Sequence, residues 1–401
     1  KNVARAVIKE KNNGNDVVVV VSAMGHTTDI LTKMAKDISA HPSSREMDML
    51  LSTGEGVSIA LLAMALQAQG CDAVSMNAMQ VGIITENIHS NARILEIKTN
   101  KIVKNLEEGK VVVIAGFQGV TDDFEITTLG RGGSDTSAVA LAGALKAKRC
   151  DIYTDVEGVY TTDPRIVPHA SKLKEISYEE MLELARVGAN VLHPRAVEAA
   201  TQYHMPVRVR STFKTDNLGT LILGVDKMEL QRPVTGVAAD LSQLRVVVCD
   251  VQDSPGTAAI LFDGLAKENI SVDMIIQSYA RKALNTNDIA FTISKNDLDK
   301  TREILEKVKP ELNYSNVFID DKIAKISIVG AGMIDRPGIA AKMFRTLADL
   351  DINIKMISTS EIKISCLVEQ SRANDAVEVL HTVFGLDSKS VAEVKGDLPN
   401  V

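Results

Sequence analysis

The segment Leu129-Gly-Arg-Gly-Gly-Ser-Asp135 leads directly into an alanine-rich stretch with helical periodicity. Glycines let a ligand approach the backbone, and the first turn of a helix offers free N–H groups to an anion. The guanidinium of Arg131 suits a carboxylate or a phosphate, and Asp135 could position a metal ion or a lysine. The same residues also suit a plain turn in which Ser134 or Asp135 caps the helix, and the segment alone favours neither interpretation.

A second candidate group is the carboxylate of Glu55, in the segment Ser52-Thr-Gly-Glu55 at the expected start of a long helix. The Ser-x-x-Glu spacing is that of a capping box, which would explain Glu55 by itself. The carboxylate could instead bind the ammonium group of a substrate. The spacing alone favours the cap over the binding role.

Polar side chains follow two apolar runs that have the pattern of buried strands. Ser22 and Thr28 come just after Val17–Val21, a β-branched run typical of a strand buried on both faces of a parallel sheet. Thr154 and Asp155 end a second such run. Ligands of open α/β sheets bind beyond the carboxyl ends of strands, so these side chains are placed for a substrate or a phosphate. An ordinary strand–helix connection is the alternative.

The elements that would position these groups alternate along the first half of the chain. This alternation predicts a sheet covered by helices on both faces. The expected strands are Val17–Val21, Lys110–Ala115, Asp151–Thr154 and Pro206–Arg210, and the expected helices are Thr28–Ser39, Ser52–Gln69, Thr136–Lys148, Glu179–Val187 and Pro194–Tyr203. The first residues already follow helical spacing without a cap, so we expect a preceding strand and loop outside this numbering.

An internal repeat organises the second half. Asp253-Ser-Pro-Gly256 and Asp335-Arg-Pro-Gly338 align without gaps at an offset of 82 residues, and apolar positions continue to match beyond them. Each unit is expected to run strand, turn, helix, strand, strand, helix. The helix after each turn could hold the carboxylate of an amino acid, which suggests paired effector sites. The alternative is that the turns only start helices.

Composition excludes several classes of function. The 401 residues carry a net charge of −7, which argues against a nucleic-acid or anionic-membrane surface, and the chain has no Trp for base stacking. The longest apolar runs fall short of the ~20 residues that span a bilayer. Four scattered cysteines without a CxxC or other metal spacing suggest reduced thiols in a cytoplasmic protein.

Taken together, seven segments resemble the aspartate kinase family, and the resemblance covers essentially the whole chain. The segment Ile357–Ser365 also resembles the second ACT module of that family. The seven segments are Ser22-Ala-Met-Gly25, Leu51-Ser-Thr-Gly-Glu55, Gly82-Ile-Ile-Thr85, Ala115-Gly-Phe-Gln-Gly119, Thr128-Leu-Gly-Arg-Gly-Gly-Ser-Asp135, Thr154-Asp-Val-Glu-Gly-Val-Tyr-Thr-Thr-Asp-Pro-Arg165 and Val191-Leu-His-Pro194.

The resemblance implies an amino-acid kinase domain with an αβα sandwich fold, followed by two ferredoxin-like (βαββαβ) ACT domains. The expected limits are 1–225 for the kinase domain, 236–312 for the first ACT domain, completed by 389–397, and 322–388 for the second. The implied reaction is ATP-dependent phosphorylation of the side-chain carboxylate of L-aspartate to 4-phospho-L-aspartate, without a covalent enzyme intermediate. This is the first step toward lysine, threonine and methionine. The alternatives are another carboxylate kinase of this fold and a non-catalytic, amino-acid-sensing chain.

Site roles carried over from the family cover the substrate, the phosphoryl group and the nucleotide. Arg131 is expected to pair with the α-carboxylate of aspartate and Glu55 with its ammonium group. Asp135 would organise the catalytic lysine, and Mg²⁺ would bridge the phosphates of ATP. Supporting residues for the substrate and the phosphoryl group are Ser22, Thr28 and Ser134, and those for ATP are Thr154, Asp155, Tyr160 and Arg165.

The ACT pair implies feedback by lysine, threonine or both, through surfaces completed in a homodimer or a larger oligomer. The expected effector residues are Asp253, Gly256, Gln277, Asp335, Gly338, Ile357, Ser358, Thr359, Ser360 and Glu361. Two departures from the family stand out. The Lys-Phe-Gly-Gly segment that supplies the catalytic lysine should precede Lys1, and Asn190 stands where many relatives have a lysine that contacts the nucleotide.

Overall fold

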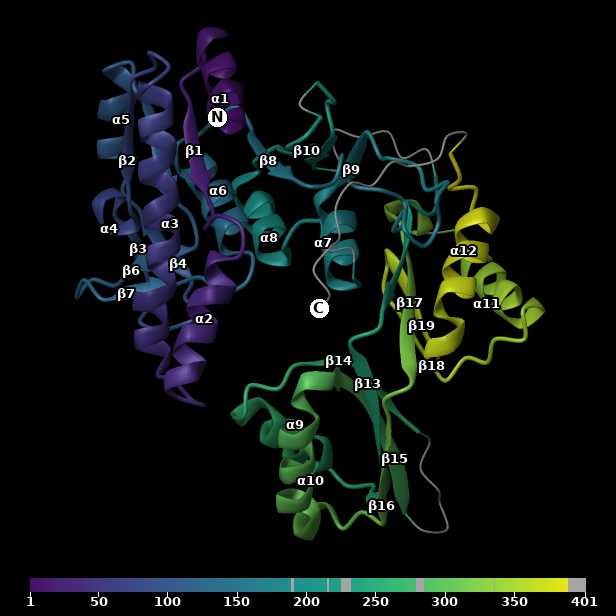
Figure 1. The fold of residues 1–401 in the computed structure, drawn as a ribbon. Coiled ribbons are helices and arrows are strands. Elements are labelled where there is room, and N and C mark those ends of the chain that lie inside the picture. The colour runs from purple at the N-terminus through teal and green to yellow at the C-terminus, as the bar shows by residue number, and fades with distance from the viewer. Residues whose placement is uncertain (189–190, 215, 225–231, 279–284, 335, 389–401) are drawn as a thin grey trace.

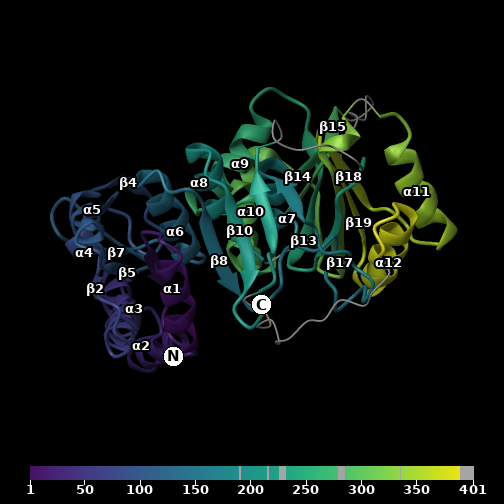
Figure 2. The same ribbon diagram turned by 90° about the horizontal axis from the view of Figure 1, so that it is seen from above.

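The computed structural model describes residues 1–188, 191–214, 216–224, 232–278, 285–334 and 336–388. Three sheets with their helices form the first part of the chain, and two smaller α/β modules follow (Figure 1). Seen from above, the N-terminal helices lie at one end of the molecule, and α11 and α12 lie at the other (Figure 2).

The first sheet is parallel and has the order β1-β5-β2, from Val18–Val21, Val111–Ala115 and Ala73–Met76. One face packs on α1 (Asn2–Asn12) and α3 (Ser44–Gln67). The other face packs on α5 (Asn100–Glu107) and α6 (Gly133–Ala144). Alternate valines of β5 point to the two faces, and all five of its residues are buried. The predicted sheet with helices on both faces is therefore confirmed.

Two further sheets complete this part of the chain. One has the order β8-β10-β11-β9 and packs on α7 and α8, and the other has the order β4-β3-β6-β7. The remaining bounds here are α2 Thr27–Ile38, α4 Ala78–Val81, β3 Ile83–Thr85, β4 Ile94–Ile97, β6 Gln118–Val120, β7 Ile126–Thr128, β8 Cys150–Thr154, β9 Glu175–Ser177, α7 Tyr178–Arg186, α8 Pro194–Tyr203, β10 Val207–Ser211 and β11 Thr220–Leu223.

Two local predictions differ from the structure. The first strand is only half-buried, because among the described residues β1 lies at an edge of its sheet and pairs with β5 alone. The long helix does not begin at Ser52: α3 begins at Ser44, and its N-cap is Ser43, whose side chain accepts from the backbone N–H of Glu46. The predicted capping box at Ser52 is therefore wrong, since these residues lie in the middle of the helix.

The first ACT module has the order β14-β15-β13-β16 with α9 and α10, and the second has the order β12-β17-β19-β18 with α11 and α12. The bounds are β12 Gly236–Asp240, β13 Gln243–Gln252, α9 Thr257–Lys267, β14 Val272–Gln277, β15 Thr286–Ser294, α10 Leu298–Leu312, β16 Asn316–Asp320, β17 Ile323–Val329, α11 Ile339–Asp349, β18 Met356–Thr359, β19 Lys363–Glu369 and α12 Ala373–Val383.

The predicted repeat is confirmed at the level of single residues. Helices α9 and α11 begin and end 82 positions apart. The residues before them, Gly256 and Gly338, both have φ of +97°, a backbone conformation that favours glycine. Gly256 and Gly338 therefore start their helices in the same way.

The outer strands of the modules differ from the expected division. Gly236–Asp240, expected in the first ACT domain, pairs antiparallel with β17 of the second module. In the sheet of the first ACT module, the fourth strand is β16, which pairs with β13. Residues 389–397, which were expected to complete this module, lie outside the described residues. The first module is therefore inserted between β12 and the rest of the second.

Helix α3 is the one helix among the described residues that is long and apolar enough to cross a membrane by length and composition. Its side chains Asp48 and Glu55 are buried against the neighbouring strands and loops, and Ile59 and Leu66 pack in the core of the first sheet. In the structure it is a core helix of this sheet.

Candidate active site

Glu55 is a buried carboxylate with one unused oxygen. The residue is 3% exposed, and its Oε1 accepts from the backbone N–H of Ala23 at 2.9 Å. Its Oε2 is buried without a hydrogen-bond partner among the described residues. Burial raises the pKa of Glu55, and the bond from Ala23 opposes that rise. A buried carboxylate oxygen without a partner lowers the stability of the folded state unless a cation or a hydrogen-bond donor binds it.

The carboxyl ends of β1 and β5 meet beside the start of α6. The backbone N–H of Gly116, directly after β5, donates to the carbonyl of Val21, which directly precedes Ser22. A Cβ on Gly116 would lie 2.8 Å from the hydroxyl of Ser134, so only glycine allows this approach. Ser22, Ser134 and Glu55 therefore surround the ends of the two strands, as the sequence predicts for a ligand site.

Asp135 lies in the first turn of α6, where a carboxylate faces the positive end of the helix dipole. Burial raises its pKa to about 6, and a hydrogen bond from the backbone of His193 opposes the rise. Ser22, Ser134 and Asp135 line a cavity of about 1270 Å³ that extends between β1 and β8. Strand residues from Val17 to Val21 and from Cys150 to Tyr153 form much of its wall.

Arg131 stands exposed at the tip of the glycine-rich loop. In the described part of the chain its guanidinium forms no ion pair and no side-chain hydrogen bond. A Cβ on Gly132 would lie 2.2 Å from the side chain of His193, so the loop passes too close to α8 for any other residue. Arg131 is also one of the positive charges that lower the pKa of His193. The loop is thus held at its base while its arginine faces solvent.

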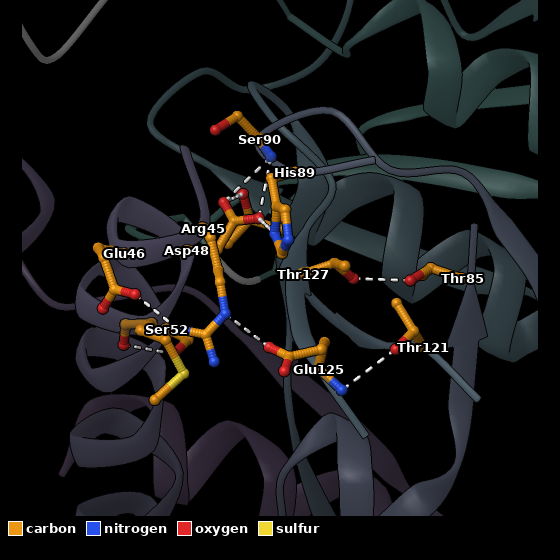
Figure 3. A network of polar contacts seen from close by, with 12 residues as sticks. Arg45, Glu46, Asp48, Ser52, Thr85, His89, Ser90, Thr121, Glu125 and Thr127 are labelled. Carbon is orange, nitrogen blue, oxygen red and sulfur yellow. Dashed lines mark hydrogen bonds and ion pairs between the residues drawn. The ribbon is translucent and has the colours of Figure 1, made fainter. Parts of the chain in front are cut away.

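Buried polar contacts that the sequence interpretation missed fix the base of this loop (Figure 3). Asp48 is fully buried on α3 and accepts from the backbone N–H of Ser90, from the Thr128 hydroxyl at 2.6 Å and from Nδ1 of His89 at 2.9 Å. Thr128 directly precedes the glycine-rich segment. Asp48 lies seven residues before Glu55 and therefore on the same face of the helix. This spacing could have indicated from the sequence that both carboxylates are buried.

Arg195 of α8 holds the same loop from the other side. Its guanidinium donates to the backbone carbonyl of Leu129, to the carbonyl of Ala92 at 2.6 Å and to the side chain of Asn91 at 3.0 Å. The segment 89–92 and the start of the glycine-rich loop are therefore joined through one planar group.

We expect Asp48→Asn to lower the free energy of unfolding by about 2–4 kcal/mol, because one buried carboxylate oxygen becomes an NH2 donor that faces N–H and O–H groups in need of an acceptor. Chemical denaturation at pH 7 followed by circular dichroism measures the change. The matched control is Glu46→Gln on the same helix, whose exposed ion pair with Arg45 is worth less than about 1 kcal/mol. Equal effects of the two substitutions would contradict a structural role for the Asp48 contacts.

The expected nucleotide residues fall on one connection. Thr154 ends β8, and its hydroxyl donates to Asp155 at 2.9 Å. Tyr160 lies beyond them and bridges to Lys172 through its backbone. The exposed Arg165 forms a bidentate pair with Asp163. This pairing was not expected from the sequence, and the guanidinium would have to share or leave it to reach a phosphate.

The other expected residues are Thr28 and the effector residues, and they lie on other elements. Thr28 is exposed on the first turn of α2, and its neighbour Thr27 is the residue that approaches Gly54 of α3. The effector residues of the first module lie in the turn before α9 and at the end of β14. Of those of the second module, Gly338 directly precedes α11, and residues 357–361 lie on β18 and the turn after it. Asp335 and Asn190 lie outside the described residues.

The described residues contain no group of three or more His, Cys, Asp or Glu side chains that could hold a metal ion. A Mg²⁺ ion at this site would therefore depend on the phosphates of a nucleotide for most of its ligands, as is usual for this ion.

The profile of the amino acid kinase family matches residues 1–211, and that of the ACT domain matches residues 245–308 and 326–384. An aspartokinase from Bacillus sp. strain MGA3 is 56% identical over 390 residues, covering 97% of this chain and 94% of the relative.

Two crystal structures of aspartokinase III from E. coli are also similar, each at 27% identity. The R-state complex with aspartate and ADP has a TM-score of 0.81 and covers 95% of both chains. The T-state complex with lysine and aspartate has a TM-score of 0.75 and covers 96% of this chain and 95% of the other. The chain therefore belongs to the amino acid kinase family and, within it, to the aspartokinases, kinases that phosphorylate a carboxyl group.

Proposed function

We propose that this aspartokinase uses Glu55 and Arg131 to hold L-aspartate and transfers the γ-phosphoryl group of ATP to its side-chain carboxylate. The unpartnered Oε2 of Glu55 carries this proposal, because a buried carboxylate oxygen beside the carboxyl end of β1 suits the ammonium group of an amino acid. Arg131 supplies a planar pair of donors for the α-carboxylate. With both ends of the amino acid held, the side-chain carboxylate is left free to react.

The remaining groups act on the phosphoryl transfer. Ser22, Ser134 and the N–H groups at the start of α6 donate to phosphoryl oxygens as the aspartate carboxylate attacks phosphorus in line. Thr28, exposed on the first turn of α2, supports the substrate from there. Thr154, Asp155, Tyr160 and Arg165 hold the nucleotide. Mg²⁺ bound to the ATP phosphates neutralises part of their charge when present.

We also propose that a strand preceding Lys1 carries the catalytic lysine and occupies the cavity between β1 and β8. Both strands turn an unpaired edge to that cavity among the described residues, and Asp135 lines it where a carboxylate could pair with an ammonium group. Two chains test this placement, one that starts at Lys1 and one that is extended upstream. Equal kinase activity of the two chains would contradict it.

Regulation follows from the two ACT modules. We propose feedback by lysine, threonine or both, at the turn before α9, the end of β14, the positions Asp335 and Gly338 before α11, and segment 357–361. The E. coli aspartokinase III structure in complex with lysine supports lysine as one candidate. A homodimer or larger assembly through these modules and a place early in lysine, threonine and methionine synthesis belong to the same proposal.

Burial raises the pKa of the Cys150 and Cys366 thiols to about 12, which suits reduced cysteines in the cytoplasm.

Hydroxylamine trapping of the acyl phosphate tests the proposal. Full-length protein, ATP and Mg²⁺ are incubated with aspartate, glutamate or N-acetylglutamate, while lysine and threonine are titrated singly and together. We expect product from aspartate alone and inhibition by at least one effector. Product from glutamate but not aspartate would overturn the substrate, and a lack of response to both effectors would overturn the regulation.

A further inference from the structure

The nucleotide connection between β8 and β9 is held by the far end of the chain. Thr161 lies between Tyr160 and Arg165, and it is 1% exposed. Its hydroxyl lies 2.7 Å from Nε2 of His381, a residue of α12 in the second ACT module and 220 positions away. A buried hydrogen bond therefore joins this kinase-domain loop to the second ACT module.

His381 is itself fully buried, and a second contact fixes which nitrogen carries its proton. Its Nδ1 lies 3.1 Å from a carboxylate oxygen of Asp387. A carboxylate accepts only, so Nδ1 donates to Asp387, and Nε2 of the neutral ring is left to accept from the Thr161 hydroxyl. Burial lowers the pKa of His381, and the contact with Asp387 opposes this, so the net effect favours the neutral ring.

Backbone contacts continue the same junction. The backbone N–H of Ser171 donates to the Thr161 hydroxyl at 2.9 Å, and the Ser171 hydroxyl donates to the carbonyl of Leu386 at 2.7 Å. The N–H of Ser388 donates to the carbonyl of His169 at 2.7 Å. Residues 386–388, just after α12, therefore run along residues 169–171 of the connection.

The strand that links the two parts of the chain reaches the same residue. The N–H of Val237 in β12 donates to the carbonyl of Thr161 at 2.8 Å. Because β12 pairs with β17, Thr161 is bonded to two elements of the second module, one through its backbone and one through its side chain. The connection thus takes its position from this module as well as from its own sheet.

We propose that His381 is a positioning residue of the nucleotide site: its bond to Thr161 holds Tyr160 and Arg165 in the arrangement that binds ATP. The proposal rests on the assignment of these two residues to ATP under the proposed function. Without the bond, the connection samples more conformations, and the apparent nucleotide affinity falls with the fraction that is competent. A shift of α12 in the second module would change the nucleotide affinity through the same hydrogen bond between His381 and Thr161.

Two pairs of substitutions separate this role from simple packing. Thr161→Val removes the hydroxyl at nearly constant shape, whereas Thr161→Ser keeps it. His381→Asn keeps a group near the position of Nδ1 and loses the reach of Nε2, whereas His381→Gln keeps that reach. We expect the valine and asparagine variants to raise the KM for ATP and the Kd for ADP about three- to tenfold. The KM for aspartate should stay within about twofold of the parent, and the serine and glutamine variants should recover most of the loss.

A control at the same interface uses Lys363→Met. This substitution breaks the 2.7 Å ion pair between β19 and Glu183 of α7 without touching the nucleotide connection. We expect its KM for ATP to match the parent. Equal increases in the KM for ATP in Lys363→Met and Thr161→Val would overturn the proposal, because the whole interface would then be responsible.

Calorimetric ADP binding and thermal unfolding complete the test on full-length protein. Lower Tm in Thr161→Val and His381→Asn with parental nucleotide affinity would reduce the contact to packing and overturn the proposal. If the parent protein binds ADP but makes no acyl phosphate from aspartate, the proposed substrate would be overturned. The ADP-binding measurements would still decide the role of His381.

Discussion

Arg131→Ala is expected to raise the KM for aspartate by about 100-fold and to leave the KM for ATP within about threefold of the parent. A bidentate pair between a guanidinium and a carboxylate is among the strongest polar contacts in proteins, and two such charged hydrogen bonds account for about 3 kcal/mol. Because the side chain is exposed and forms no ion pair within the described ranges, its loss leaves no buried group without a partner. The Tm should therefore not change.

Steady-state kinetics with either substrate varied, together with thermal unfolding, measure this prediction. Arg131→Lys should recover only part of the loss, since an ammonium group cannot reproduce the planar pair of donors. Arg302→Ala, at an exposed position of α10, is the control for loss of a positive charge. Parental kinetics in Arg131→Ala would show that the α-carboxylate binds elsewhere.

Asp135→Asn is expected to lower kcat at least about 100-fold and at the same time to stabilise the fold at pH 8. Loss of activity follows from the proposed role of Asp135 in organising the catalytic lysine, and losses of this size are typical of charged groups in active sites. The stability gain has a separate cause. Burial raises the pKa of this carboxyl from 3.8 to about 6, so its ionised form costs free energy in the folded state.

The sign of the pH dependence follows from that shift. Well below pH 3.8 the carboxyl is protonated in both the folded and unfolded states, and the asparagine variant should match the parent in stability. As pH rises from about 3.8 to about 6, the unfolded chain releases this proton while the folded parent keeps it, so the parent loses stability over that range. At pH 8 the variant should be more stable by about 1–2 kcal/mol.

Chemical denaturation of both proteins at pH 4, 6 and 8 measures the difference, with Asp349→Asn at the exposed end of α11 as control. An ammonium group paired with Asp135 would favour the ionised form and reduce the gain, so a chain extended upstream of Lys1 should show a smaller difference. A variant that is less stable than the parent at pH 8 would show that Asp135 is already paired with a cation.

Much of the architecture could be predicted from periodicity. Helix α8 runs from Pro194 to Tyr203 as predicted, because its apolar spacing, its proline at the first position and its flanking residues agree. The repeat was equally clear, since the same turn and helix recur 82 residues apart. In each case the information is local: the pattern of one segment determines which of its faces can be buried.

The start of α3 shows where local information ends. Ser43 and Glu46 have the same Ser-x-x-Glu spacing as Ser52 and Glu55, so the sequence offers two starts to one helix. The structure uses the first, and Glu55 is thereby left in the middle of the helix, with one oxygen bonded to Ala23 and the other without a partner among the described residues. Spacing favoured the cap for Glu55, and packing against the end of β1 excluded it.

By itself the sequence determined the alternation of helices and strands, the two ACT units and the motifs that identify an aspartokinase. Tertiary structure alone decided which strand completes each ACT sheet, which carboxylate oxygen stays available to a ligand, and that His381 meets Thr161 across 220 residues. The reason is physical. Local patterns state which residues must leave water, whereas the partner of a buried polar group depends on how distant segments pack, and no periodicity encodes that.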